Sequence, residues 1–143
     1  MAEDLSPSAG KIRVKITCPL SVVADMEADR VLIPALGGDF LVMPQKAPQF
    51  FLMREGKVVI QRQDMADKVY WVSKGVCEVR RDICAVMAWA EEKTGVSLDK
   101  IRSELERGEK LLTTLPAGKA AWAIQNRLGF YRLILKEVTS SSD

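Results

Sequence analysis

The run VYWVSKGVCEVRRDICAVM, residues 69–87, contains three short apolar segments separated by turns. The segments occupy residues 69–72, 76–79 and 83–87, and Gly75 marks the first turn. Apolar segments this short, evenly spaced and with turn signals between them, are typical of an antiparallel sandwich or barrel. The run therefore predicts three consecutive strands of an antiparallel β domain.

The same pattern continues toward the N-terminus. Ile12, Val14 and Ile16 alternate with basic residues, which is the period of two expected for a strand with one buried face. Further short apolar segments, bounded by turn residues, lie at 30–33, 40–43, 50–53 and 58–60. We therefore expect an N-terminal antiparallel β-sandwich over residues 11–92, preceded by a disordered extension at residues 1–10.

The periodicity changes once, near Lys93, from strand to helix. Ser97 is the expected N-cap of a helix over residues 98–114. Apolar or small residues at alternating three and four spacing form one seam on this helix and a second seam after the break at 115–118: Leu98, Ile101, Leu105, Gly108 and Leu112, then Ala121, Ile124, Leu128, Tyr131 and Leu135. This predicts an antiparallel helical hairpin over residues 93–138, with a flexible tail at 139–143.

A hairpin of this size is only marginally stable alone, because the entropy cost of ordering its backbone is close to the gain from burying its seams. Two interpretations stay open. The hairpin docks permanently on the sandwich, or it detaches and repacks on a partner.

Composition disfavours catalysis. The chain has 143 residues and no histidine, which removes the usual general base and the commonest zinc ligand. Phosphate-binding glycine loops and nucleophile elbows are also missing from the sequence. We therefore expect a non-catalytic protein that requires no cofactor and no metal.

The charge balance and the cysteines bear on partners and compartment. With 21 Lys+Arg against 19 Asp+Glu, the net charge of +2 is too small to mark a nucleic-acid binder, and no apolar run is long enough to cross a bilayer. The three cysteines, which form no C-x-x-C pair, are expected to be buried thiols. Their odd number and the acidic start of the chain favour the reducing cytoplasm.

Basic residues recur on the second helix away from its seam: Lys119, Arg127, Arg132 and Lys136. They are either a solvated face or a cationic stripe that binds an acidic partner.

From Met26 onward the sequence resembles the epsilon subunit of F-type ATP synthases. Residues 38–48, GDFLVMPQKAP, are similar to that family's Gly-Glu step followed by Pro-Gly-His-Ala-Pro. Residues 72–79, VSKGVCEV, resemble its Val-Ser-Gly-Gly-x-x-Glu-Val hairpin, and residues 98–103, LDKIRS, resemble the motif that opens its first C-terminal helix. Gln45, Lys46 and Ser103 depart from the family pattern, which indicates a divergent, bacterial-type member.

This resemblance implies a non-catalytic subunit of the central stalk. The sandwich would bind the gamma subunit and rest on the ring of c subunits, with Asp39 and Lys46 in loops that face the ring. The hairpin would contact the alpha/beta catalytic head through Lys119, Arg127, Arg132 and Lys136 and inhibit ATP hydrolysis. The protein would lie peripherally at the cytoplasmic side of the inner (plasma) membrane, and the alternative is a stand-alone interaction module outside the motor.

Some members of the family bind regulatory ATP between the folded helices. The positions that match their nucleotide ligands are Asp99 and Arg102 on the first helix and Arg127 and Arg132 on the second. Two arginines could clamp phosphate groups bidentately. The alternative to nucleotide binding is that Asp99 caps its helix and Arg102 is solvated.

Overall fold

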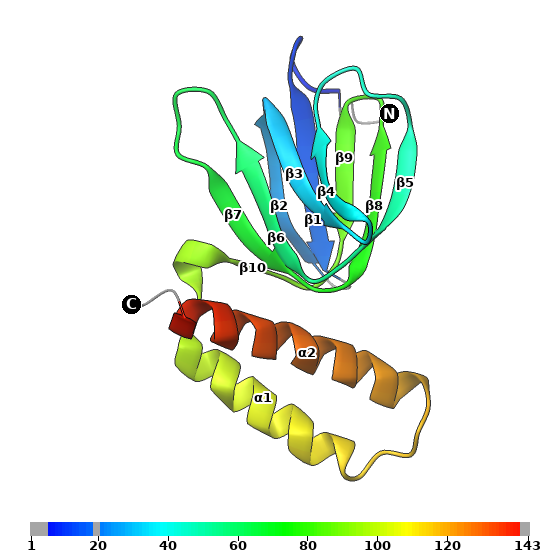
Figure 1. The fold of residues 1–143 in the computed structure, drawn as a ribbon, viewed down its shortest axis with the longest axis vertical. Helices are drawn as coiled ribbons and strands as arrows, with labels where there is room; N and C mark the ends of the chain where they lie inside the picture. Colours follow the sequence, from blue (N-terminus) through cyan, green and yellow to red (C-terminus); the bar gives the residue numbers. More distant parts are fainter. Residues whose placement is uncertain (1–5, 19–20, 141–143) are drawn as a thin grey trace. The chain divides into compact units, whose positions relative to one another are not determined.

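The computed structural model describes residues 6–18 and 21–140, and the chain divides into two compact units between Lys93 and Thr94. The first unit is a sandwich of ten strands (Figure 1). The strands are β1 (Ile12–Cys18), β2 (Ser21–Ala28), β3 (Arg30–Ala35), β4 (Gly38–Val42), β5 (Gln49–Met53), β6 (Gly56–Gln61), β7 (Lys68–Val72), β8 (Gly75–Arg80), β9 (Ile83–Met87) and β10 (Ala90–Glu92). The expected β-sandwich followed by a helical hairpin is confirmed.

The strands follow one another in the order β10-β7-β6-β3-β5-β8-β9-β1-β2, and β4 pairs with β3 off this path. One pair among the described strands, β1 with β9, is parallel, so the expectation of a purely antiparallel sandwich needs this correction. The two strands are far apart in sequence and no hairpin turn joins them, so the chain is free to bring them together in parallel.

Two strands, β2 and β10, have no counterpart among the segments expected from the sequence. In β2 the fully inward positions are the small residues Ala24 and Ala28, so the apolar alternation is weak. The register also shifts opposite Ile16 and Thr17, where a bulge interrupts the period of two.

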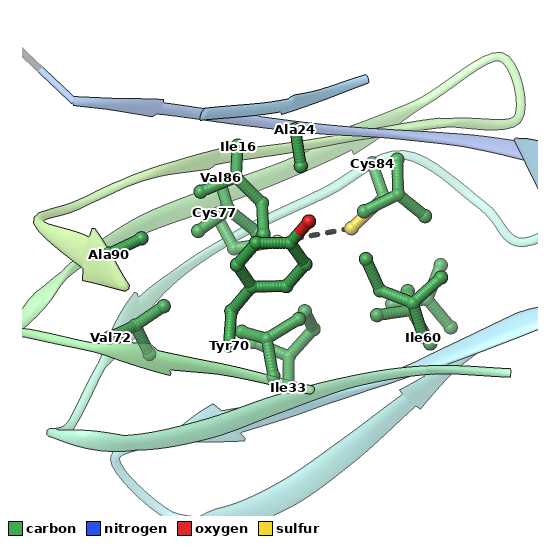
Figure 2. Packing of buried hydrophobic residues seen from close by; sticks show 14 of the residues in the cluster. Ile16, Ala24, Ile33, Ile60, Tyr70, Val72, Cys77, Cys84, Val86 and Ala90 are labelled. Carbon is green, nitrogen blue, oxygen red and sulfur yellow. Dashed lines mark hydrogen bonds between the residues drawn. The ribbon is translucent and has the colours of Figure 1, made fainter. Parts of the chain in front are cut away.

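The core lies between the inward faces of the strands and consists mainly of β-branched side chains, as Figure 2 shows. Ile12, Val14 and Ile16 of β1 are fully buried, which confirms the alternation in that strand. Cys77 and Cys84 are also buried, as expected, whereas Cys18 is only half-buried because it ends its strand.

A short 3-10 turn (Lys93–Gly95) spans the division between the units, and the second unit contains the helices α1 (Leu98–Leu112) and α2 (Lys119–Ser140). Ser97 caps α1, and its side chain accepts a hydrogen bond from the Lys100 N–H. Gly108 lies against Leu128 on α2, since a Cβ built on Gly108 would be 2.4 Å from a Leu128 methyl carbon. The two seams therefore meet in a hairpin whose first helix ends two residues before the expected residue 114.

At the ends of the chain, residues 1–5 and 141–143 lie outside the described residues. Within the extension expected to be disordered, the Ser8 N–H and hydroxyl both donate to Glu27, at 2.9 and 3.0 Å. Within the expected tail, Thr139 belongs to α2 and its hydroxyl donates to the Leu135 carbonyl.

Candidate partner-binding surface

Apolar side chains form a row on the outer face of β5, β8 and β9. Leu52 faces Val76 across the β5–β8 ladder, and Val76 faces Met87 across the β8–β9 ladder. Leu52 is 53% exposed and Met87 41%, and Phe50, two residues before Leu52, is 65% exposed. We call Phe50, Leu52, Val76 and Met87 the apolar row. Contiguous exposed apolar side chains of this kind mark surfaces that bind other proteins.

A charged border adjoins the apolar row. Phe50 faces Glu78 on β8, and farther along the same outer face Lys15 of β1 faces Asp25 of β2. Arg13 donates to both carboxylate oxygens of Asp25, at 2.7 and 2.8 Å, and this hydrogen bonding lowers the pKa of Asp25 below its ordinary value. An apolar centre beside a polar border is the usual anatomy of a protein interface.

A shallow hollow of about 430 Å³ continues the apolar row past Phe50. Its walls come from Pro48, which precedes β5, from the start of β5 with Phe50, and from β8 with Arg80. A partner's side chain could insert there next to the Phe50 ring.

The apolar row is absent from the residues singled out in the sequence, although a signal for it exists. Residues 50–53 are apolar at four consecutive positions, Phe-Phe-Leu-Met. In an antiparallel sandwich only alternate positions face the core, so a continuous apolar run leaves half of its side chains outside. Here Met53 is buried, whereas Phe50 and Leu52 are exposed.

The proline-flanked loop after β4 is built on an unusual backbone conformation. Gln45 has φ +66°, in the left-handed region that favours glycine, and its N–H donates to the Asp82 carboxylate at 2.6 Å. The next residue, Lys46, places its ammonium group 5.2 Å from the centre of the Phe40 ring. Asp82 thus stabilises the conformation of Gln45, and Phe40 positions the Lys46 charge.

Asp39 and Lys46, the two residues expected to face the c-ring, are not brought together. Asp39 lies near the start of β4, where it forms an ion pair with Arg54, and Lys46 lies in the loop after the end of β4. Their backbone positions therefore lie toward opposite ends of the strand, with Asp39 in β4 itself and Lys46 beyond it. Leu36, in the turn that precedes Asp39, is 62% exposed.

The two arginines of α2 that match nucleotide ligands have partners within the hairpin. Arg132 donates to Glu109 of α1 at 3.2 Å. The Arg127 Nε donates to the Tyr131 hydroxyl at 2.9 Å, and the guanidinium lies 5.3 Å from the centre of the Tyr131 ring. The sequence pattern indicates both arginines, but it predicts neither of these two contacts.

The four expected nucleotide-binding residues are not gathered at one place in the hairpin. Asp99 and Arg102 pair weakly with each other, 3.8 Å apart, at the start of α1. Glu109, the partner of Arg132, lies about 15 Å farther along α1 at about 1.5 Å per residue. Because the helices are antiparallel, Arg127 is farther still from Asp99.

The basic residues of α2 do not form a single stripe. At about 100° per residue, Arg127 and Lys136 point in nearly opposite directions from the helix axis, whereas Arg132 and Lys136 are about 40° apart. Lys119, Arg132 and Lys136 are exposed, and Arg127 is half-buried. The cationic surface that a partner could meet is therefore centred on Arg132 and Lys136.

Over residues 6–18 and 21–140, acidic and cysteine side chains nowhere group closely enough to hold a metal ion. None of the helices described is long and apolar enough to span a membrane.

The described residues thus form a β-sandwich followed by a helical hairpin, and the sandwich carries an exposed apolar row that can bind another protein. A family model, ATP synthase, Delta/Epsilon chain, beta-sandwich domain, matches residues 11–93. The chain therefore belongs to the delta/epsilon chain family of ATP synthases, in agreement with the resemblance found in its sequence.

Curated relatives and solved structures agree with this family. The ATP synthase epsilon chain of Gloeobacter violaceus is 30% identical over 72% of this chain and 78% of its own length. That of Moorella thermoacetica is 30% identical over 75% of this chain and 81% of its own length. A chain in the Euglena gracilis mitochondrial ATP synthase OSCP/F1/c-ring assembly shares the fold with a TM-score of 0.61 at 12% identity, covering 93% of this chain and 83% of that one. One in the Tetrahymena thermophila central stalk/c-ring structure has a TM-score of 0.52 at 14% identity, covering 89% and 96%.

Proposed function

We propose that this chain is a non-catalytic rotor subunit in the central stalk of an F-type ATP synthase. In that role it couples rotation of the c-ring to ATP synthesis through the gamma subunit. The observation that carries the proposal is the apolar row on a sandwich whose family is that of ATP synthase epsilon chains. A small domain gains nothing from exposing these side chains unless a partner covers them.

The gamma subunit is the partner we assign to the apolar row. Phe50 has the features of an interface anchor, because it is a large aromatic side chain beside a hollow and is bordered by charged residues. Burying one such apolar side chain stabilises a complex by about 1.5 to 3 kcal/mol before the cost of association. The row alone can thus supply a large part of the binding free energy.

Contact with the c-ring is assigned to one loop rather than two. Asp39 lies near the start of β4 and Lys46 follows its end, so we assign the ring contact to one end of this strand. The exposed Leu36 beside Asp39 favours the turn before β4 as the ring contact. Lys46 then faces another part of the stalk, and the protein lies peripherally at the cytoplasmic side of the inner (plasma) membrane.

The hairpin is proposed to inhibit ATP hydrolysis by binding the alpha/beta catalytic head. Its exposed cations at Arg132 and Lys136 lie on one side of α2 and could attract an acidic segment of the head. Lys119 and Arg127 would take part only if the head contacts further sides of the helix. Regulatory ATP bound between the helices stays a prediction.

The proposal is tested by capturing the organism's own gamma subunit with this chain and assaying the reconstituted catalytic head with and without it. We expect stoichiometric capture and a change in ATP hydrolysis. The double variant Leu52→Glu/Met87→Glu should lose capture, because two charges would be buried at the interface.

Met65→Glu is the matched control, since Met65 is 59% exposed but lies in the turn between β6 and β7, away from the apolar row. If the folded wild-type chain captures no gamma subunit, the stand-alone interaction module becomes the better explanation. If both variants bind like the wild type, gamma binds elsewhere on the sandwich.

A further inference from the structure

Two thiols meet inside the core of the sandwich. Cys77 on β8 and Cys84 on β9 are fully buried, and their sulfur atoms lie 3.6 Å apart. Figure 2 shows this contact among the apolar side chains that surround Tyr70. The hydrogen bond with Cys77, together with burial, raises the pKa of Cys84, which therefore stays protonated at neutral pH.

The strand register makes the two cysteines diagonal neighbours. Cys77 faces Val86 and Cys84 faces Val79 across the β8–β9 ladder. Diagonal residues have Cα atoms about 7–8 Å apart, yet both side chains point into the core and their sulfur atoms converge. The tight turn at Arg81 and Asp82, with φ +52° and +61°, holds the two strands together.

The two sulfur atoms are close enough for covalent closure by small movements. A disulfide bond is about 2.05 Å long, so closing a gap of 3.6 Å moves each sulfur by about 0.8 Å if both move equally. Because a disulfide usually joins Cα atoms about 4.4–6.8 Å apart, closure also requires β8 and β9 to move together by about 1 Å at this diagonal, in addition to rotations about the two Cα–Cβ bonds.

We propose that Cys77 and Cys84 are an oxidation site at which a small-molecule disulfide, such as glutathione disulfide, converts the dithiol to an intramolecular disulfide. One deprotonated cysteine attacks a glutathione sulfur and releases one glutathione thiolate, leaving a mixed disulfide. The second cysteine, after losing its proton, attacks the protein sulfur of that mixed disulfide and releases the second glutathione. Two protein thiols lose two electrons, one glutathione disulfide gains them, and the two protons end on the released glutathiones.

Burial slows the first step of this exchange. Glutathione disulfide is too large to enter the closed core, so the first attack requires local opening of the β8–β9 hairpin. While the hairpin is open, the second cysteine, seven residues away in the sequence, stays near the mixed disulfide and attacks it, and the hairpin closes only after the second glutathione has left.

The test compares the oxidation equilibrium in the folded and the unfolded chain. Full-length protein carrying Cys18→Ser is equilibrated with glutathione redox buffers in native buffer and in denaturing urea, then acid-quenched, alkylated and analysed by mass spectrometry. We expect the equilibrium constant for the Cys77–Cys84 disulfide to be about tenfold larger in native buffer, which corresponds to about 1.4 kcal/mol. The oxidised protein should then unfold with a free energy larger by the same amount, because the four states form a closed cycle.

Cys77→Ala in the same background is the matched control and should form only mixed disulfides with glutathione. An equilibrium constant that is equal or smaller in native buffer would overturn the proposal, since the fold would then hold the thiols apart. Wild-type protein should keep Cys18 alkylatable after oxidation, and a bond between Cys18 and either core cysteine would also overturn it.

Discussion

At the start of β8, the backbone of Gly75 passes close to the end of β9. A Cβ atom built on Gly75 would lie 2.2 Å from the Met87 carbonyl oxygen and 2.8 Å from the Ala88 Cβ. The φ angle is not what requires glycine here, because no left-handed value is found at this residue. Glycine is needed for space alone.

Gly75→Ala should therefore destabilise the sandwich by about 1 to 3 kcal/mol, the range for overpacking in a closely packed region. Chemical unfolding monitored by circular dichroism measures this change. Gly37→Ala is the control, since no atom lies within 4 Å of a Cβ built there. Equal stability of the two variants would mean that β9 moves away easily.

Asp25 provides a test of electrostatics on the charged border. Its pKa is lowered below the ordinary 3.8, chiefly by the hydrogen bonds from Arg13. A carboxylate with a lowered folded-state pKa contributes stability above its unfolded pKa and loses that contribution as the pH falls through the folded value.

Asp25→Asn should thus lower the free energy of unfolding by up to about 1 kcal/mol at pH 7, the usual limit for an ion pair near the surface. The difference from the wild type should shrink as the pH falls below about 4, because the wild-type carboxylate then becomes protonated. Urea unfolding across this pH range measures both values. A difference that is constant with pH would show that shape, rather than charge, stabilises this pair.

Single residues were predictable from the sequence where a local rule applies. Ser97 follows the rule for helix N-caps, and Gly108 follows from the seam of α1. At Gln45 the sequence shows only that a residue other than glycine must adopt the backbone conformation of the loop. The residue that stabilises this conformation, Asp82, is 37 positions later in the sequence. Such a partner comes from tertiary packing, which a single sequence does not display.

At the scale of elements, the strands with β-branched alternation were predictable and β2 was not. Its inward alanines and the bulge opposite β1 remove the period of two on which the inference depends. The apolar row does not follow from the strand pattern, because the apolar run at residues 50–53 predicts a strand without showing which half of its side chains faces outward. The helices were predictable because a three-and-four spacing persists over several turns. The expected seam of α2 is correct only in part, since Phe130 and Ile134 are fully buried off the seam and Ile124 and Leu135 are half-buried.

The contact between Arg132 and Glu109 in the hairpin allows a test of the predicted nucleotide site. If Arg132 is a phosphate ligand, ATP must compete with Glu109 for its guanidinium. Glu109→Gln should then bind ATP more tightly than the wild type, by about threefold to tenfold, because a charge-assisted competitor is weakened. Asp99→Ala should bind more weakly.

Isothermal titration calorimetry with ATP measures all three proteins. Equal heats for the wild type and Asp99→Ala would remove Asp99 from the site. Equal affinities for the wild type and Glu109→Gln would show that Arg132 is not a ligand.

At the scale of the whole molecule, the two units on either side of the division between Lys93 and Thr94 differ in the size of their buried cores. The sandwich has a large β-branched core of its own, whereas the hairpin has fewer buried side chains, namely Ile101 on α1 and Ala121, Leu128, Phe130, Tyr131 and Ile134 on α2. A unit of low intrinsic stability can change partners at a small cost in free energy, which suits a regulatory role.

Removing residues 94–143 tests that role directly. The cut belongs after Lys93, because a cut after Ala90 would remove most of β10 and the Lys68–Glu92 ion pair of 2.6 Å. We expect the truncated chain to capture the gamma subunit as well as the full chain does, since the apolar row is intact. ATP hydrolysis by the reconstituted complex should rise severalfold, because no hairpin can then bind the catalytic head.

The full chain with Arg132→Ala and Lys136→Ala should give a rate of ATP hydrolysis between those of the full wild-type chain and the truncated chain. This rate should respond less to added salt, since screening weakens only the charge attraction. Unchanged hydrolysis after truncation, with gamma still bound, would restrict this chain to coupling and assign the hairpin no inhibitory part.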